Sequence, residues 1–141
     1  MAFRIISRGV KNIDLNNNQL RNLSSDTNNK MKMYIGVTLN TSQTSKNKHW
    51  VDMEFELNAK NEGSDKAVYI LSFTHSCLVE TSDLNATELQ RMLMIDVPAY
   101  ELPRIDAYTK EITKGTGYAP FSIIELDFEQ LYNSKTQNTN N

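Results

Sequence analysis

The sequence predicts an α+β protein, because segments with strand periodicity fill its first half and segments with helix caps fill its second half. Apolar and polar residues alternate from Met33 to Asn40 and again from Val51 to Lys60, the pattern of strands buried on one face. A polar turn separates these two runs. At 141 residues the chain has the length of a single domain, which we expect to span residues 1–132.

The first predicted strand runs from Phe3 to Leu15. Its apolar residues are widely spaced, and we expect an edge strand that is interrupted near Gly9. The residues that follow, as far as Lys30, are rich in asparagine and contain few apolar anchors. Such a segment predicts a long crossover loop rather than a helix.

The last predicted strand follows a hairpin loop at residues 61–65, which contains Gly63. The run from Ala67 to Phe73 is apolar with little alternation, as in a strand that is covered on both faces. The few helices of so short a chain can cover only one face, so a second subunit would cover the other. We therefore expect an oligomer interface at Tyr69, Ile70, Leu71 and Phe73.

A capping box marks the start of the first predicted helix. Asn85 is followed three residues later by Glu88, so the helix begins near Ala86. We expect it to run through Met94 and to end before Pro98, because the residue before a proline avoids helical geometry.

Two further helices are expected in the C-terminal third of the chain. Pro103 suits a first helical position, and Gly115 or Gly117 would stop the helix that it begins. Asp127 caps a short last helix. The wholly polar tail, residues 133–141, is expected to be disordered.

The composition argues against several functional classes. With 15 Lys and Arg against 17 Asp and Glu, the net charge is −2, which gives no basic footprint for nucleic acid. No run approaches the roughly twenty apolar residues of a transmembrane helix. The chain shows no export signal, and its single cysteine, Cys77, cannot form an internal disulfide, so we expect a cytoplasmic protein.

The sequence offers no catalytic or metal-binding constellation. His49 and His75 lie in different elements, and Cys77 beside His75 on one strand face makes only two ligands, too few for a zinc site. Glu54 and Glu56 fit the solvated outer face of a sheet better than a pair of catalytic carboxylates. We expect a binding protein with no cofactor, no metal and no enzymatic activity; only a deep polar pocket around His75 and Cys77 would favour an enzyme.

A collinear set of motifs is similar to the SecB family of export chaperones. Pro98 and Pro103 keep the five-residue spacing of that family's two prolines, Gly117–Pro120 stands in for its Gly-Phe-Pro-Pro loop, and Asp127–Tyr132 matches its closing Asp-Phe-x-x-Leu-Tyr. The resemblance implies a four-stranded antiparallel sheet of Greek-key type with two to three helices packed on one face. It also implies a homotetramer, built as a dimer of dimers, that holds unfolded client polypeptides for export or transport.

The resemblance further implies long apolar grooves, in which clients bind through many weak contacts and through backbone hydrogen bonds at strand edges. We expect the crossover loop and the faces beneath it to line such a groove. Ordinary core packing is the alternative role of each lining residue. The candidates are Leu20, Leu23, Met31, Met33, Tyr118 and Phe121.

The chain departs from the family at positions that concern its partners. The family's arginine after the second proline is replaced by Asp106. In export SecB, acidic residues on the exposed sheet dock the SecA motor, whereas the corresponding positions here are Asn12, Asn16, Tyr69 and Leu71. SecA is therefore a weakened candidate partner. The alternatives are a chaperone dedicated to one partner, such as an antitoxin, and a structural or accessory protein of a mobile element.

Overall fold

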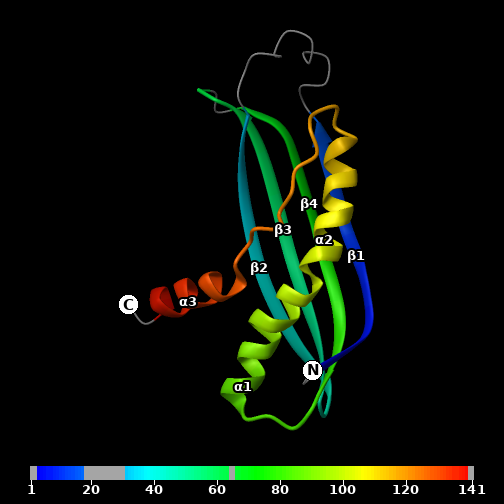
Figure 1. Cartoon of the computed structure of the whole chain (residues 1–141), viewed down its shortest axis with the longest axis vertical. Helices are drawn as coiled ribbons and strands as arrows, with labels where there is room; N and C mark the ends of the chain where they lie inside the picture. Colours follow the sequence, from blue (N-terminus) through cyan, green and yellow to red (C-terminus); the bar gives the residue numbers. More distant parts are fainter. Residues whose placement is uncertain (1–2, 18–30, 64–65, 140–141) are drawn as a thin grey trace.

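The computed structural model describes residues 3–17, 31–63 and 66–139, and it shows a four-stranded sheet with a layer of helices on one face (Figure 1). The strands are β1 (Phe3–Asn17), β2 (Met31–Ser45), β3 (Lys48–Asn61) and β4 (Ala67–Thr81). The helical segments are α1 (Ala86–Arg91), the π-helical turn η2 (Met92–Asp96), α2 (Val97–Lys114) and α3 (Phe128–Thr139). Among the described residues, no helix is long and apolar enough to span a membrane.

The sheet is antiparallel throughout, with the strand order β1-β4-β3-β2. Three consecutive strands joined by hairpins, with the remaining strand returning to lie beside the last of them, form a Greek key. The predicted fold class is therefore confirmed. β1 and β2 are the two edge strands, and β4 lies between β1 and β3.

β4 is longer than the predicted strand, since it continues to Thr81 instead of ending near Phe73. Its central position explains the length, because β1 and β3 supply hydrogen-bonding partners along both of its sides. In its second half, buried residues alternate with half-buried ones, from His75 through Val79.

The edge strand β1 is irregular, but not at Gly9 as predicted. Its register with β4 shifts between Ile5 and Ser7 and again between Lys11 and Asp14. Asn12, within the second shift, has a positive φ of 58°, a conformation that asparagine tolerates better than most residues. These irregularities twist the edge strand without ending its pairing.

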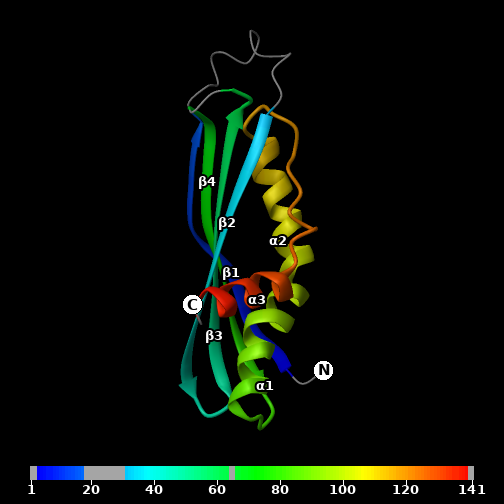
Figure 2. The ribbon, with the colours of Figure 1, turned by 90° about the vertical axis from the view of Figure 1, so that its left-hand side faces the viewer.

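The hydrophobic core lies between the sheet and α2, which crosses the inner face of the strands (Figure 2). Phe55 and Phe73 stack at its centre, with ring centroids 5.1 Å apart. On the opposite, outer face, Glu54 and Glu56 are exposed, as the alternation along this strand predicts.

The predicted interface residues of β4 have two different environments within this chain. Tyr69, Leu71 and Phe73 are at most 2% exposed and lie in this chain's own core. The cause is the alternation of side chains along a strand, which an apolar run does not reveal. These three residues face the helices, and the half-buried Ile70 faces the other way.

The helical layer does not break before Pro98, contrary to the prediction. α1, η2 and α2 follow one another without a loop, and Pro103 lies inside α2 rather than at its start. The ring of Pro98 would clash with the carbonyl of residue 94 in a regular α-helix. The π-helical turn, in which the Val97 N–H donates to the Met92 carbonyl, adds one residue to the turn and accommodates the proline.

The helix ends follow the predicted caps. The Asn85 side chain accepts a hydrogen bond from the Glu88 N–H at 2.8 Å, and α2 ends at Lys114 with Gly115 as its C-cap. Asp127 likewise accepts from the Gln130 N–H at 3.1 Å. The helix that it caps, α3, continues to Thr139 through residues that the sequence predicts to be disordered. Once a cap and the buried Phe128 fix the first turn, each added residue gains a hydrogen bond, which extends a helix even of polar residues.

Candidate functional site

The edge strand β2 combines an unpaired side with a row of apolar side chains. It pairs with β3 alone, so no strand among the described residues satisfies the backbone groups along its other side. From Met31 to Asn40, the odd-numbered residues are half-buried on the inner face and the even-numbered residues are exposed on the outer face. The half-buried row consists of Met31, Met33, Ile35, Val37 and Leu39. Such an edge can accept an extended peptide as an additional strand.

A groove continues this row at the C-terminal end of β2. It has a volume of about 430 Å³ and lies between residues 39–43 of β2, His49 of β3 and the helical layer. Its apolar lining comes from Leu39 on the strand side and from Leu89, Leu93 and Met94 on the helix side.

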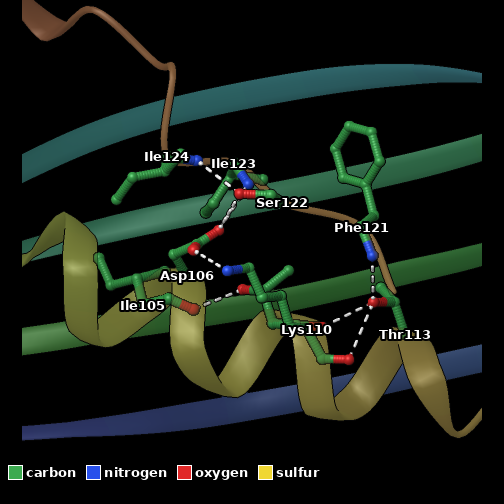
Figure 3. A network of polar contacts seen from close by, with 9 residues as sticks. Ile105, Asp106, Lys110, Thr113, Phe121, Ser122, Ile123 and Ile124 are labelled. Carbon is green, nitrogen blue, oxygen red and sulfur yellow. Dashed lines mark hydrogen bonds and ion pairs between the residues drawn. The ribbon is translucent and has the colours of Figure 1, made fainter. Parts of the chain in front are cut away.

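The segment between α2 and α3 runs through the helical layer, alongside α2 on its β2 side (Figures 1 and 2). Polar side chains of α2 hold it in place (Figure 3). Asp106 Oδ1 accepts hydrogen bonds from the Ile123 N–H at 2.7 Å and from the Ser122 hydroxyl at 2.8 Å. Two helical turns later, Thr113 Oγ1 accepts from the Phe121 N–H at 2.8 Å. The segment is therefore fixed to α2 at two points.

Asp106 is ionised in this arrangement. Burial alone would raise the pKa of its carboxyl group, but the hydrogen bonds from Ile123 and Ser122 and the Lys110 ammonium outweigh burial and lower that pKa. The Lys110 Nζ lies 3.1 Å from Asp106 Oδ2, so both carboxylate oxygens have partners.

Four of the six predicted groove residues lie in the described part of the chain. Met31, Met33 and Tyr118 gather around the buried Tyr69, whose ring lies 6.1 Å from that of Tyr118. Phe121 is half-buried against the main core, next to the point where Thr113 holds the segment. The other two, Leu20 and Leu23, lie outside the described residues.

A buried polar network, which sequence reasoning missed, joins α2 to β1 and β4. Glu101 of α2 is fully buried, and its Oε1 lies 2.8 Å from Arg8 Nε and 2.9 Å from His75 Nε2. The other ring nitrogen of His75 lies 2.9 Å from the Tyr108 hydroxyl. Since a carboxylate only accepts hydrogen bonds, we assign a proton to His75 Nε2. Glu101 is separated from Arg8 by 93 residues, and no sequence pattern indicates their contact.

The network holds the helix to the sheet through buried polar contacts. Burial alone would raise the pKa of Glu101, but the hydrogen bonds from His75 and Arg8 lower it below its usual value. Cys77 is fully buried, and burial raises the pKa of its thiol to about 12, so it is not an activated nucleophile. No group of three or more potential metal ligands occurs within the described ranges.

Comparison with known proteins gives a consistent result. The family model described as "Preprotein translocase subunit SecB" matches residues 1–139. The protein-export protein SecB of Hyphomonas neptunium is 22% identical over 134 residues, which cover 95% of this chain and 78% of the relative. That of Ruegeria pomeroyi is 19% identical over 136 residues, covering 96% of this chain and 82% of the relative.

A solved structure shares the fold. It is a SecB-like chaperone of Mycobacterium tuberculosis in complex with a ChAD peptide from an antitoxin, and it superposes with a TM-score of 0.73. The alignment covers 89% of this chain and 91% of the other, at 12% sequence identity.

Proposed function

Because this chain belongs to the SecB family of chaperones, we propose that it is a holdase, which binds unfolded client polypeptides along β2 and keeps them available for export. The observation that carries this proposal is the edge strand with an apolar row on one face. A folded protein normally covers or interrupts such an edge, since it is a template for pairing with another chain.

An extended client can use the edge and the row together. Its backbone would form hydrogen bonds to the free side of β2, which do not depend on client sequence, and its alternate side chains would contact the apolar row. Met31 and Met33 suit varied clients, because a flexible thioether adapts to side chains of different shapes. Tyr118 and Phe121 would add aromatic contacts from the α2–α3 segment, and we propose Leu20 and Leu23 as further contacts. Binding of this kind requires no catalytic residue.

Two kinds of client fit the comparisons. The curated relatives are named as export proteins, which supports unfolded secretory proteins as clients. The structural neighbour holds an antitoxin peptide, which supports a single dedicated partner as the alternative. A pull-down from native lysate separates them, because a general holdase recovers many proteins and a dedicated chaperone recovers one.

SecA is a candidate partner on the outer face of the sheet. Glu54 and Glu56 are exposed there, and the residues across from them on both neighbouring strands are uncharged: Gly36, Thr38, Ser72 and Thr74. Asn12 and Asn16 contribute no charge. We therefore propose weak SecA binding, centred on β3 and sensitive to salt; titration with SecA at low and high ionic strength measures it.

We further propose a homotetramer, assembled as a dimer of dimers in the cytoplasm. The support is the edge strand β1, which carries more than half of the exposed large apolar side chains in the described part of the chain. These are Ile6, Val10, Ile13 and Leu15. Exposed apolar residues along an unpaired edge favour pairing with a second copy. Of the interface residues predicted on β4, the proposed interface would include the half-buried Ile70. The mass of the native assembly tests this proposal.

The holdase proposal is tested by aggregation of an unfolded client in the presence of the protein. We expect wild-type protein to suppress aggregation at stoichiometric amounts, and Met33→Ser to weaken suppression. Tyr34→Ser is the matched control, because Tyr34 lies on the same strand but is 55% exposed on the outer face. Lack of suppression by the wild type would refute the holdase proposal. If both variants lose suppression of aggregation equally, with unchanged thermal stability, the client-binding site lies elsewhere.

A further inference from the structure

The polar contacts of the α2–α3 segment are concentrated on one of its sides. The N–H groups of Phe121 and Ile123, two residues apart, both donate to side chains of α2. Phe121 bonds to Thr113 and Ile123 to Asp106, so the segment runs antiparallel to the helix (Figure 3). In an extended backbone, groups two residues apart point the same way, and those between them point the opposite way. Both N–H groups therefore point toward α2, and the Ser122 hydroxyl also reaches Asp106, whereas the Phe121 ring points away from the helix (Figure 3).

The apolar side chains of the segment differ in their burial. Ile123 is 2% exposed and anchors the segment in the core, whereas Ile124 is 46% exposed and Phe121 is half-buried. The Phe121 ring points away from α2 and over the strands (Figure 3), so it adds an apolar contact on the side of the helix where the half-buried row of β2 lies.

Asp106 is built to hold this segment firmly. It is only 4% exposed, and its carboxylate has three partners: the Ile123 N–H, the Ser122 hydroxyl and the Lys110 ammonium. A buried carboxylate costs free energy unless it is fully hydrogen-bonded, so its ionised state depends on the segment remaining in place. The Ser122 hydroxyl also accepts from the Ile124 N–H at 3.3 Å, which ties the exposed isoleucine to the same anchor.

We propose that Asp106 is a positioning residue for client binding, which holds the α2–α3 segment in place so that Phe121 forms part of the client site along β2. Thr113 has the same role at the neighbouring anchor. The inference rests on the proposed function, because it concerns the same client site along β2. It adds a residue that never touches the client and still determines how tightly the client binds.

The test uses four variants and a fluorescein-labelled, reduced and carboxymethylated α-lactalbumin as the unfolded client. Asp106→Ala removes the anchor, and we expect client affinity to fall about tenfold, as for about 1.4 kcal/mol of lost contacts. Asp106→Asn keeps an acceptor oxygen and should lose about threefold. In Thr113→Val, valine has nearly the volume of threonine, and client affinity should also fall about threefold. This variant tests the proposal even if Asp106→Ala does not fold. Glu111→Ala removes an exposed carboxylate from the same helix and should change nothing.

Hydrogen exchange gives a second readout that does not depend on the client. We expect faster exchange of the Ile123 amide in Asp106→Ala and of the Phe121 amide in Thr113→Val, with slow exchange kept in β3 and β4. Unchanged exchange at both amides would overturn the anchor role. Faster exchange with unchanged client affinity would refute the positioning role of Asp106 in client binding while leaving the proposed function intact. A wild-type chain that binds no client would overturn both proposals.

Discussion

Replacing Glu101 by glutamine tests whether a buried carboxylate holds α2 onto the sheet. Glu101 Oε1 receives hydrogen bonds from Arg8 of β1 and His75 of β4, at 2.8 and 2.9 Å. Glutamine keeps the shape and an acceptor oxygen but removes the negative charge. The variant therefore removes the charge with little change in volume.

The expected loss of stability follows from these two contacts. A hydrogen bond to a charged group contributes about 1.5–3 kcal/mol and a neutral one about 1 kcal/mol, so the difference for two bonds is about 1–4 kcal/mol. The Arg8 side chain is 35% exposed, so water can replace part of the interaction with Glu101 that it loses in the variant. We therefore expect the free energy of unfolding to fall by about 2 kcal/mol. A domain with about 5–15 kcal/mol of stability remains folded after such a loss.

Urea unfolding followed by circular dichroism measures this loss at pH 7. A double-mutant cycle with Arg8→Gln should give a coupling of about 1 kcal/mol, because the two groups are in direct contact. A loss below about 0.5 kcal/mol, or strictly additive effects, would refute the conclusion that the ion pair fastens α2 to the edge strand.

The same variant makes a prediction for pH. The folded-state pKa of Glu101 lies below its unfolded value, so its stabilisation is fully present above the unfolded pKa of about 4.3 and is lost as the pH falls through the folded value. The wild type should therefore lose its advantage over Glu101→Gln in acid. An advantage that grows on acidification would contradict the sign of this pKa shift.

Three further predictions concern the core, the backbone and the buried thiol. Phe73→Ala removes half of the central aromatic stack and should cost about 3–5 kcal/mol in urea unfolding. Gly63→Ala should cost about 1 kcal/mol, since φ is +82° there, whereas Gly9→Ala meets no atom within 4 Å and should be tolerated; equal costs would contradict this. Iodoacetamide should alkylate Cys77 at pH 8 at least about 100-fold more slowly in the native protein than in urea, and rapid native labelling would show that the thiol is accessible.

Local patterns predicted most of the elements. The alternation around Met33 and Val51 identified β2 and β3 because a strand with one buried face repeats every two residues. The Asn85 cap likewise identified the start of α1, because a cap and its partner are only three residues apart. In such cases the determining contacts lie within a few residues, and a sequence displays them directly.

Neighbouring elements explain where the predictions differ from the structure. Pro98 normally ends a helix, but a π-helical turn accommodates it here within a continuous helical layer. The apolar run that begins at Ala67 suggested a strand covered from both sides, whereas α2 covers only the face that carries Leu71 and Phe73. Asp106 was visible in the sequence only as a departure from a family pattern, and its partners Ser122 and Ile123 lie 16 and 17 residues away.

The sequence by itself therefore determined the α+β class, the periodic strands, the helix caps and the family, since each depends on short-range patterns or on motifs in order along the chain. Tertiary structure alone decided which apolar residues remain available for clients or other subunits. It also decided which buried charges have partners, as Glu101 shows with Arg8 across 93 residues. The physical reason is that burial and charge pairing depend on distances in space, which the sheet sets by bringing β1 and β4 beneath α2.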